Sequence, residues 1–118
     1  MNNLGVVEIN GTNVQLFAGE QAEDFVPITI VAGTGVVPVG QVLGRVTASG
    51  KYAKYVDGNS NGTEVARLIA AEAVDATAAD VNTSAMYNGV FNRAALTGID
   101  QAGEYDLLDR GILVKALG

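Results

Sequence analysis

The stretch VGQVLGRVTASGKYAKYVDGNSNG, from Val39 to Gly62, decides the fold class of this chain. Apolar and polar residues alternate in QVLGRVTA (41–48) and again in KYAKYV (51–56), which is the period-2 pattern of half-buried β-strands. Ser49-Gly50 joins the two runs and predicts a tight connection. We therefore expect two neighbouring strands of a β-rich domain, followed by a polar turn at residues 57–62.

The N-terminal region contains the strongest turn signal of the chain, Asn10-Gly11, between two alternating runs in VVEINGTNVQLF (6–17). A two-residue type I′ turn needs positive φ at both central positions, which this dipeptide tolerates. A lone hairpin is marginally stable in water, so this one needs another surface to lie on. The register that the turn imposes pairs Val7 with Val14, Glu8 with Asn13, and Ile9 with Thr12.

Between the hairpin and the quoted stretch, the sequence predicts a loop, a strand and a second loop. AGEQAED (18–24) is acidic, and AGTGVVPVG (32–40) is rich in the turn formers glycine and proline. FVPITIV (25–31) predicts a strand. Pro27 places that strand at a sheet edge, or lies near the strand's start, because proline lacks the N–H that a central strand donates.

Downstream, the segment TEVARLIAAEAVDATAADV (63–81) fits two structures. Val65, Leu68 and Ile69 follow helical spacing, and alanine favours helix, yet the short apolar run ARLIAAEAV also suits a buried strand. We expect a strand, because the neighbouring segments are strands.

The C-terminal third adds strands and short helical turns. SAMYNGVFN (84–92) predicts a strand, a turn and a strand, and GILVKAL (111–117) predicts a last strand. Helical turns are expected at residues 92–96 and 101–110, the second with Leu107 and Leu108 facing inward. The predicted fold is thus mainly β with short helices.

Composition excludes several classes of function. The 118 residues suggest one domain, and a net charge of −6 with a pI near 4.3 argues against nucleic acid and anionic membranes as partners. The chain contains no cysteine and no histidine, which removes thiolate chemistry, the usual general base and the commonest metal ligand. The N-terminus has no basic start followed by an apolar run, so we expect no signal peptide. We expect a protein that is not an enzyme.

Four patterns could still carry chemistry, and each has a simpler interpretation. DGNSNG (57–62) matches the first half of a calcium loop, but its twelfth position is Leu68, where a glutamate is required, so we expect a polar turn and no metal site. AGTG (32–35) lacks the third glycine of a nucleotide-binding loop, and no helix is expected after it, so we expect no cofactor.

Asp75 and Asp80 are expected to be solvated rather than a catalytic pair. The four tyrosines, which could stack on a sugar or a base, are expected as half-buried sheet residues: Tyr52, Tyr55, Tyr87 and Tyr105.

The order of several short motifs resembles the lambda-type head decoration proteins of tailed bacteriophages. The resemblance covers roughly residues 14–117, is most specific in GQVLGRVTASGKY with the Asp-Gly that follows, and does not extend to residues 1–13. The motifs that carry it are LFAGE (16–20), PITIVAGTG (27–35), VGQVLGRVTASGKY (39–52), VDG (56–58), ARLIAAEAVDA (66–76), NGVFN (88–92) and RGILV (110–114).

This resemblance implies a β-clip-like domain and a structural function without cofactors. Members of the family bind as homotrimers to the outer surface of the capsid at three-fold and quasi-three-fold positions, after the shell has expanded. They are made in the host cytoplasm and stabilise the head against the pressure of packaged DNA. The implied partners are the major capsid protein and other copies of the chain, with no nucleic acid and no membrane.

We expect the capsid contact in an extended N-terminal arm at residues 1–30, which precedes a decoration domain at residues 31–118. The first 30 residues are strongly β-forming, and such a segment can pair with its own domain or add strands to the sheet edge of a partner. A carbohydrate- or peptide-binding β-module remains an alternative function. The residues expected to bind the capsid are Val14, Leu16, Phe17, Phe25, Val26, Ile28 and Ile30.

Overall fold

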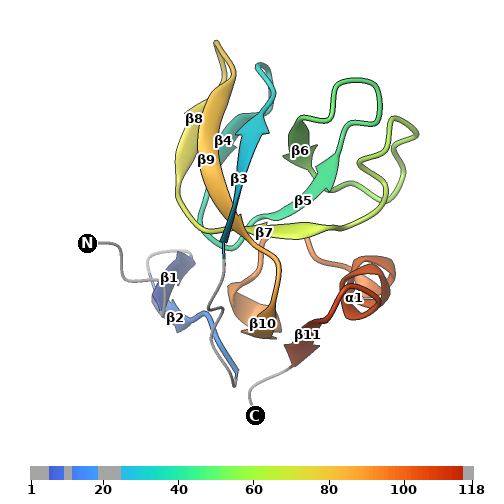
Figure 1. Cartoon of the computed structure of the whole chain (residues 1–118). Helices are drawn as coiled ribbons and strands as arrows, with labels where there is room; N and C mark the ends of the chain where they lie inside the picture. Colours follow the sequence, from blue (N-terminus) through green and yellow to red (C-terminus); the bar gives the residue numbers. More distant parts are fainter. Residues whose placement is uncertain (1–5, 10–11, 19–24, 116–118) are drawn as a thin grey trace.

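The computed structural model describes residues 6–9, 12–18 and 25–115 and confirms a mainly β fold with one short α-helix and one 3-10 turn in that part of the chain (Figure 1). The Asn10-Gly11 turn and residues 19–24 of the expected acidic loop lie outside the described residues. The elements are β1 (Val6–Ile9), β2 (Thr12–Gln15), β3 (Phe25–Ile30), β4 (Gly35–Val37), β5 (Val42–Arg45), β6 (Tyr52–Lys54), β7 (Leu68–Ala70), β8 (Val74–Ala76), β9 (Val81–Met86), β10 (Gly89–Asn92), η1 (Arg93–Ala95), α1 (Gln101–Leu108) and β11 (Ile112–Lys115).

A closed barrel with the strand order β3-β6-β5-β7-β9 forms the centre of the molecule. The quoted stretch supplies β5 and β6, the two neighbouring strands that the alternation predicts. They pair antiparallel, with Gly44 opposite Ala53. A small antiparallel pair, β4 and β8, lies next to the barrel, so a short strand interrupts the loop expected at residues 32–40. The connections β3–β4 and β8–β9 point to one end of the molecule, and β1, β2, β10 and β11 lie at the other (Figure 1).

The ambiguous segment 63–81 forms strands and no helix, as expected. In β7, Leu68 and Ala70 point into the barrel, and Ile69 between them points to its outer face, so both faces of this strand are buried. A strand that is covered on both sides needs a continuous apolar run rather than an alternating one. This tertiary burial decides against the helix that the local spacing of apolar residues also permits.

Strand β3 explains the position of Pro27. All six residues of β3 pair with β9, whereas β3 meets β6 only at Ile30 and Tyr52. Val31 N–H donates to the Tyr52 carbonyl at 2.9 Å, so odd-numbered residues of β3 direct their backbone groups toward β6. Pro27 is one of them and faces the part of β3 that β6 leaves open. β3 is not an edge strand, because the barrel is closed; Pro27 instead lies near the start of β3, the second of the two expected positions, where β6 does not pair with it.

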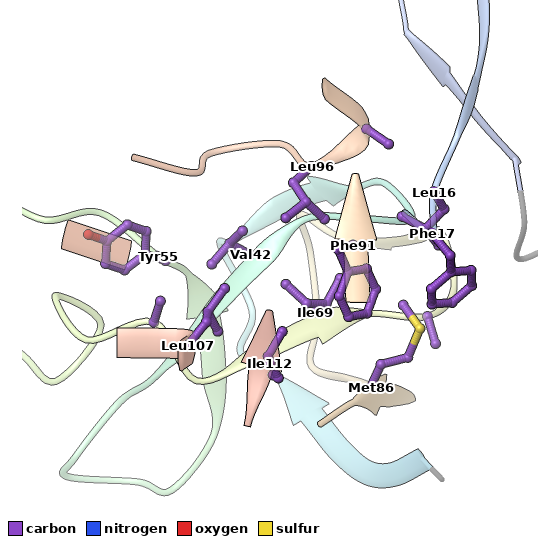
Figure 2. Close-up of a cluster of buried hydrophobic side chains, with 13 residues drawn as sticks. Leu16, Phe17, Val42, Tyr55, Ile69, Met86, Phe91, Leu96, Leu107 and Ile112 are labelled. Atoms are coloured by element: carbon purple, nitrogen blue, oxygen red, sulfur yellow. The ribbon is translucent and has the colours of Figure 1, made fainter. Parts of the chain in front are cut away.

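Two apolar clusters lie on the two sides of the barrel wall. The interior cluster is built from β3, β5, β7 and β9, with Val37 and Ala76 from β4 and β8. The second cluster packs the outer face of β5, β7 and β9 against the C-terminal elements (Figure 2). Its largest members are Leu16, Phe17, Val42, Tyr55, Ile69, Met86, Phe91, Leu96, Leu107 and Ile112.

The C-terminal elements agree with the sequence in type but differ in pairing and facing. Strand β10 follows β9 after a turn, as expected, yet it pairs in parallel with β11 rather than with β9. Helix α1 buries Leu107 completely but leaves Leu108 54% exposed, so the expectation that both leucines face inward was wrong for Leu108. Consecutive helical residues point about 100° apart, and α1 packs only one face on the barrel.

Candidate functional site

The root of the N-terminal segment is attached to strand β10. Asn92 N–H donates to the Leu16 carbonyl at 2.7 Å, the Asn92 side-chain amide donates to the Gln15 carbonyl at 2.7 Å, and Ala18 N–H donates to the Val90 carbonyl at 2.9 Å. The rings of Phe17 and Phe91 lie 5.1 Å apart, within the range of favourable aromatic pairs. Residues 15–18 are therefore part of the folded body.

Beyond this root, β1 and β2 form a two-stranded sheet that pairs with no third strand among the described residues. Its register is the expected one, with Val7 opposite Val14 and Ile9 opposite Thr12. The Asn10-Gly11 turn signal thus predicts the pairing correctly. A two-stranded sheet has unpaired backbone groups on both outer edges, which another strand can use.

The structure does not bring the seven expected capsid-binding residues together. Leu16 and Phe17 are buried in the outer cluster, and Ile28 and Ile30 are buried in the barrel interior. Phe25 is 41% exposed, Val26 is half-buried at the rim of the barrel, and Val14 lies in β2. Residues 25–30 of the expected arm form β3 of the barrel, so the segment that extends from the body ends before Gln15.

The open side of β3 borders a surface groove that the sequence reasoning missed. A mainly apolar hollow of about 340 Å³ is lined by Phe25, Val26, Pro27, Tyr52, Leu68 and Tyr87. A larger, more polar hollow of about 580 Å³ shares Pro27 and Tyr52 with it and extends along Thr29, Ser49, Lys51 and Asn82. Together they form one groove, which we call the β3–β6 groove. Tyr87 lies at the apolar end of this groove and is 42% exposed. It follows the strand signal of β9, where the sequence predicts a half-buried sheet residue.

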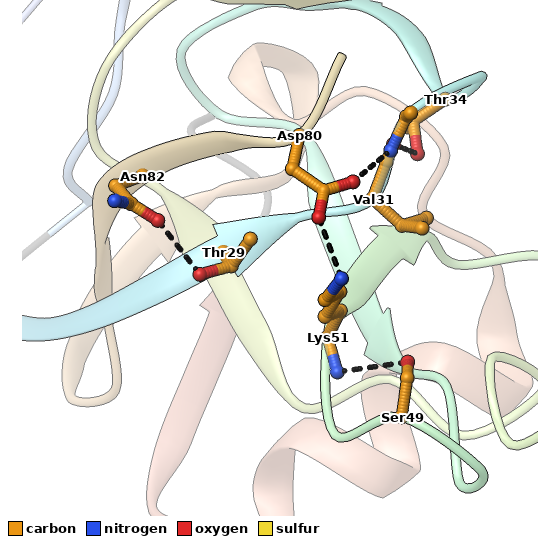
Figure 3. A network of polar contacts seen from close by, with 8 residues as sticks. Thr29, Val31, Thr34, Ser49, Lys51, Asp80 and Asn82 are labelled. Atoms are coloured by element: carbon orange, nitrogen blue, oxygen red, sulfur yellow. Dashed lines mark hydrogen bonds and ion pairs between the residues drawn. The ribbon is translucent and has the colours of Figure 1, made fainter.

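A network of hydrogen bonds and one ion pair lies at the polar end of the β3–β6 groove (Figure 3). Lys51 Nζ donates to Asp80 Oδ2 at 2.6 Å, and Ala32 N–H donates to Asp80 Oδ1 at 2.8 Å. The hydrogen bond from Lys51, with that from Ala32, lowers the pKa of Asp80. Thr29 Oγ1 donates to Asn82 Oδ1 at 2.8 Å across β3 and β9. These contacts tie three elements together at the barrel end and keep Asp80 ionised.

Two of the other patterns are a turn and an exposed carboxylate. Residues 57–62 form a turn in which Asn61 Oδ1 accepts from Thr63 N–H at 3.2 Å, and the described residues contain no cluster of three acidic side chains that could hold a metal ion. Asp75 is exposed and accepts a hydrogen bond from the Thr77 hydroxyl, which lowers the pKa of Asp75. In the part of the chain that the structure describes, no helix is long and apolar enough to cross a membrane.

The tyrosines are not uniformly the half-buried sheet residues that the sequence predicted. Tyr52 is half-buried in β6, but Tyr55 is only 3% exposed, and Tyr105 is 61% exposed on α1. The Tyr55 hydroxyl donates to Asp100 Oδ1 at 2.7 Å, and the same carboxylate oxygen accepts from Gly103 N–H at 2.7 Å as the cap of α1. Burial, with the hydrogen bond to Asp100, raises the pKa of Tyr55. Tyr55 therefore joins helix and barrel.

The described residues thus define a small β-barrel protein with a two-stranded hairpin at one end and a groove along β3. The family model of the bacteriophage lambda head decoration protein D matches residues 7–112. The chain belongs to this family of phage head decoration proteins, which confirms the resemblance and places the chain among structural components of the virion. The match begins at residue 7, so the expectation that the resemblance excludes residues 1–13 was wrong for residues 7–13. No curated protein matches the chain.

Proposed function

We propose that the chain is a cement protein that binds the outer surface of the expanded phage head as a homotrimer, at three-fold and quasi-three-fold sites, and stabilises the head against internal DNA pressure. The family match over residues 7–112 is the observation that carries this proposal. The net charge of −6 supports it, because an acidic protein suits a solvent-facing surface better than one facing packaged DNA.

The hairpin β1–β2, which pairs with no third strand among the described residues, gives the proposal a physical mechanism. Each arm orders on the shell and adds backbone hydrogen bonds to the major capsid protein, at about 0.5–1.5 kcal/mol net for each bond. Part of this gain is offset by the entropy of ordering the arm, so one arm alone binds weakly. Three arms on one trimer make the later contacts intramolecular and raise the affinity about a hundredfold or more.

Binding stabilises the expanded lattice only if the trimer prefers it. A ligand with equal affinity for both lattices would shift nothing, whereas one that fits only the expanded form stabilises that form by mass action. Of the expected capsid residues, Val14 lies in the arm and Phe25 and Val26 lie at the accessible rim of β3. Leu16, Phe17, Ile28 and Ile30 contribute by fixing the positions from which these segments extend.

The test is a deletion of residues 1–14, which removes the arm and keeps Leu16 and Phe17 in the core. The truncated chain should remain a folded trimer and lose co-sedimentation with expanded shells. A matched control replaces residues 1–14 by a glycine-serine segment of equal length, which should also fail to bind. Full binding by the truncated chain would disprove the arm mechanism.

A further inference from the structure

We infer that Asn61-Gly62 is an autocatalytic deamidation site, at which the folded chain converts Asn61 to aspartate and isoaspartate through a cyclic imide. The site lies in the DGNSNG turn (57–62), which the proposed function does not use. The inference is therefore independent of capsid binding. It depends on the groups around the two reacting atoms, which are the backbone nitrogen of Gly62 and the side-chain carbonyl carbon Cγ of Asn61.

The reaction needs no co-reactant other than water. The Gly62 nitrogen loses its proton and attacks Asn61 Cγ, a C–N bond forms, and the bond from Cγ to Nδ2 breaks, so that the amide nitrogen leaves as ammonia. The product is a succinimide ring. Water then opens this ring at either carbonyl carbon, which gives aspartate or isoaspartate. Because the reacting atoms belong to adjacent residues, the ring closes without the approach of a distant group.

A carboxylate is positioned to take the proton from the attacking nitrogen. Gly62 N–H donates to Glu64 Oε1 at 2.8 Å. This hydrogen bond lies in the plane of the peptide group, so it leaves the face of the nitrogen open to Cγ. Gly62 has no Cβ that would crowd the nitrogen on that face. A base held in this way typically accelerates a reaction about 10²–10⁴-fold.

Two donors are positioned at the oxygen on which negative charge develops during the attack. Asn61 Oδ1 accepts from Thr63 N–H at 3.2 Å and from the Thr63 hydroxyl at 2.5 Å. The Asn59 side-chain amide donates to the same hydroxyl at 2.9 Å and so directs the hydroxyl proton toward Asn61. Thr63 is only 1% exposed, so packing fixes both donors. Fixed donors of this kind stabilise the transition states of acyl transfer.

The backbone of Asn61 is held in place while its side chain stays accessible. Thr47 N–H donates to the Asn61 carbonyl at 2.9 Å, which fixes the peptide group that carries the attacking nitrogen. The side chain of Asn61 is exposed, so ammonia can leave and water can reach the ring. Each conversion replaces a neutral amide by a carboxylate and adds one negative charge to a chain of net charge −6.

Peptide mapping by mass spectrometry tests the inference on wild-type protein stored at neutral pH. Conversion of the amide to an acid changes the mass, and isoaspartate elutes separately from aspartate. Asn61 should react about tenfold faster or more in the folded chain than in the same chain unfolded in urea. A rate in the folded chain equal to or below that of the unfolded chain would overturn the inference, because the turn would then only hold Asn61 in place.

Glu64→Gln tests the base, and Glu72→Gln is its matched control. A glutamine oxygen can accept from Gly62 N–H but cannot take its proton, so Glu64→Gln should slow the reaction about tenfold or more. Its rate should also rise about tenfold per pH unit between pH 6 and 8, as expected for hydroxide as the base, whereas the wild-type rate should rise much less. Glu72, which accepts from the Thr83 hydroxyl, lies outside the turn, and its variant should behave like wild type.

The outcomes separate this inference from the proposed function. A wild-type rate and pH profile in Glu64→Gln would overturn the autocatalytic site and leave the cement function standing. Slowing in Glu64→Gln but not in Glu72→Gln, with the changed pH profile, would support the site whether or not the protein binds shells. The comparison of folded and unfolded wild-type chains needs no variant, so it decides the question even if Glu64→Gln does not fold.

Discussion

Gly62 shows how a single residue without a side chain holds the long 57–67 connection against the barrel. Its φ is +108°, and a Cβ at this position would collide with the Arg45 carbonyl and the Thr47 hydroxyl. Both neighbours are close because Thr47 N–H donates to the Asn61 carbonyl at 2.9 Å. Gly58 in the same connection has no positive φ and nothing near its would-be Cβ, so the two glycines have different functions.

Gly62→Ala should therefore lower the free energy of unfolding by about 2 kcal/mol or more, through backbone strain and steric overlap. Gly58→Ala is the matched control and should change it by less than about 0.5 kcal/mol. Urea denaturation followed by circular dichroism measures both. Equal effects of the two substitutions would show that the close approach at Gly62 is not rigid.

Tyr55 predicts a pH dependence at alkaline pH. Its pKa in the folded state is raised above the ordinary value of 10.0, first by burial and then by Asp100. Below pH 10 the hydroxyl is protonated in both states and contributes no pH dependence. Above pH 10 the unfolded chain loses this proton and the folded chain keeps it, so stability falls as pH rises, by about 1.4 kcal/mol per pH unit.

Tyr55→Phe should remove this slope between pH 10 and 11.5, measured by urea denaturation at several pH values. At neutral pH the substitution should cost about 1 kcal/mol, because Asp100 loses one donor but still caps α1 through Gly103. Tyr105→Phe, at an exposed position, is the control and should retain the wild-type slope. An unchanged slope in Tyr55→Phe would contradict the assignment.

At the scale of elements, the sequence predicts local pairings well and distant ones poorly. The β1–β2 register follows from Asn10-Gly11, because a two-residue turn leaves one pairing. The parallel pair β10–β11 could not be predicted, because a run such as GILVKAL indicates a strand without naming its partner. The capsid residues show the same limit: Phe17 and Phe25 occur in similar apolar contexts, yet only packing makes one core and the other surface.

Helix α1 offers a direct test of how this packing divides neighbouring residues. Leu107 is fully buried in the outer cluster, and Leu108 is 54% exposed. Leu107→Ala should lower the free energy of unfolding by about 2–5 kcal/mol, and Leu108→Ala by less than about 1 kcal/mol. Both replace the same side chain in the same helix, so helix propensity cancels in the comparison. Similar losses in the two variants would mean that α1 packs in a different rotation.

At the scale of the whole molecule, the barrel separates two ends with different exposed features. The hairpin β1–β2 lies at one end with β10 and β11, and the Lys51–Asp80 network holds the other (Figures 1 and 3). A protein that binds through its hairpin end would present the β3–β4 and β8–β9 connections to solvent. Three such molecules acting together would provide the binding strength that one two-stranded hairpin lacks.

Mixed trimers test this cooperation between arms. The wild-type chain should have a native mass three times its 12.1 kDa, and co-expression with a tagged chain lacking residues 1–14 should give trimers with three, two, one or no arms. Affinity for expanded shells should fall steeply with each arm lost, by about a hundredfold in total between three arms and one, because each remaining arm loses the effective concentration that its neighbours provide. Unexpanded shells should bind none of the species tightly, since the proposed stabilisation requires a preference for the expanded lattice. Equal affinity of one-arm and three-arm trimers would mean that a single contact carries the binding and that trimerisation serves another purpose.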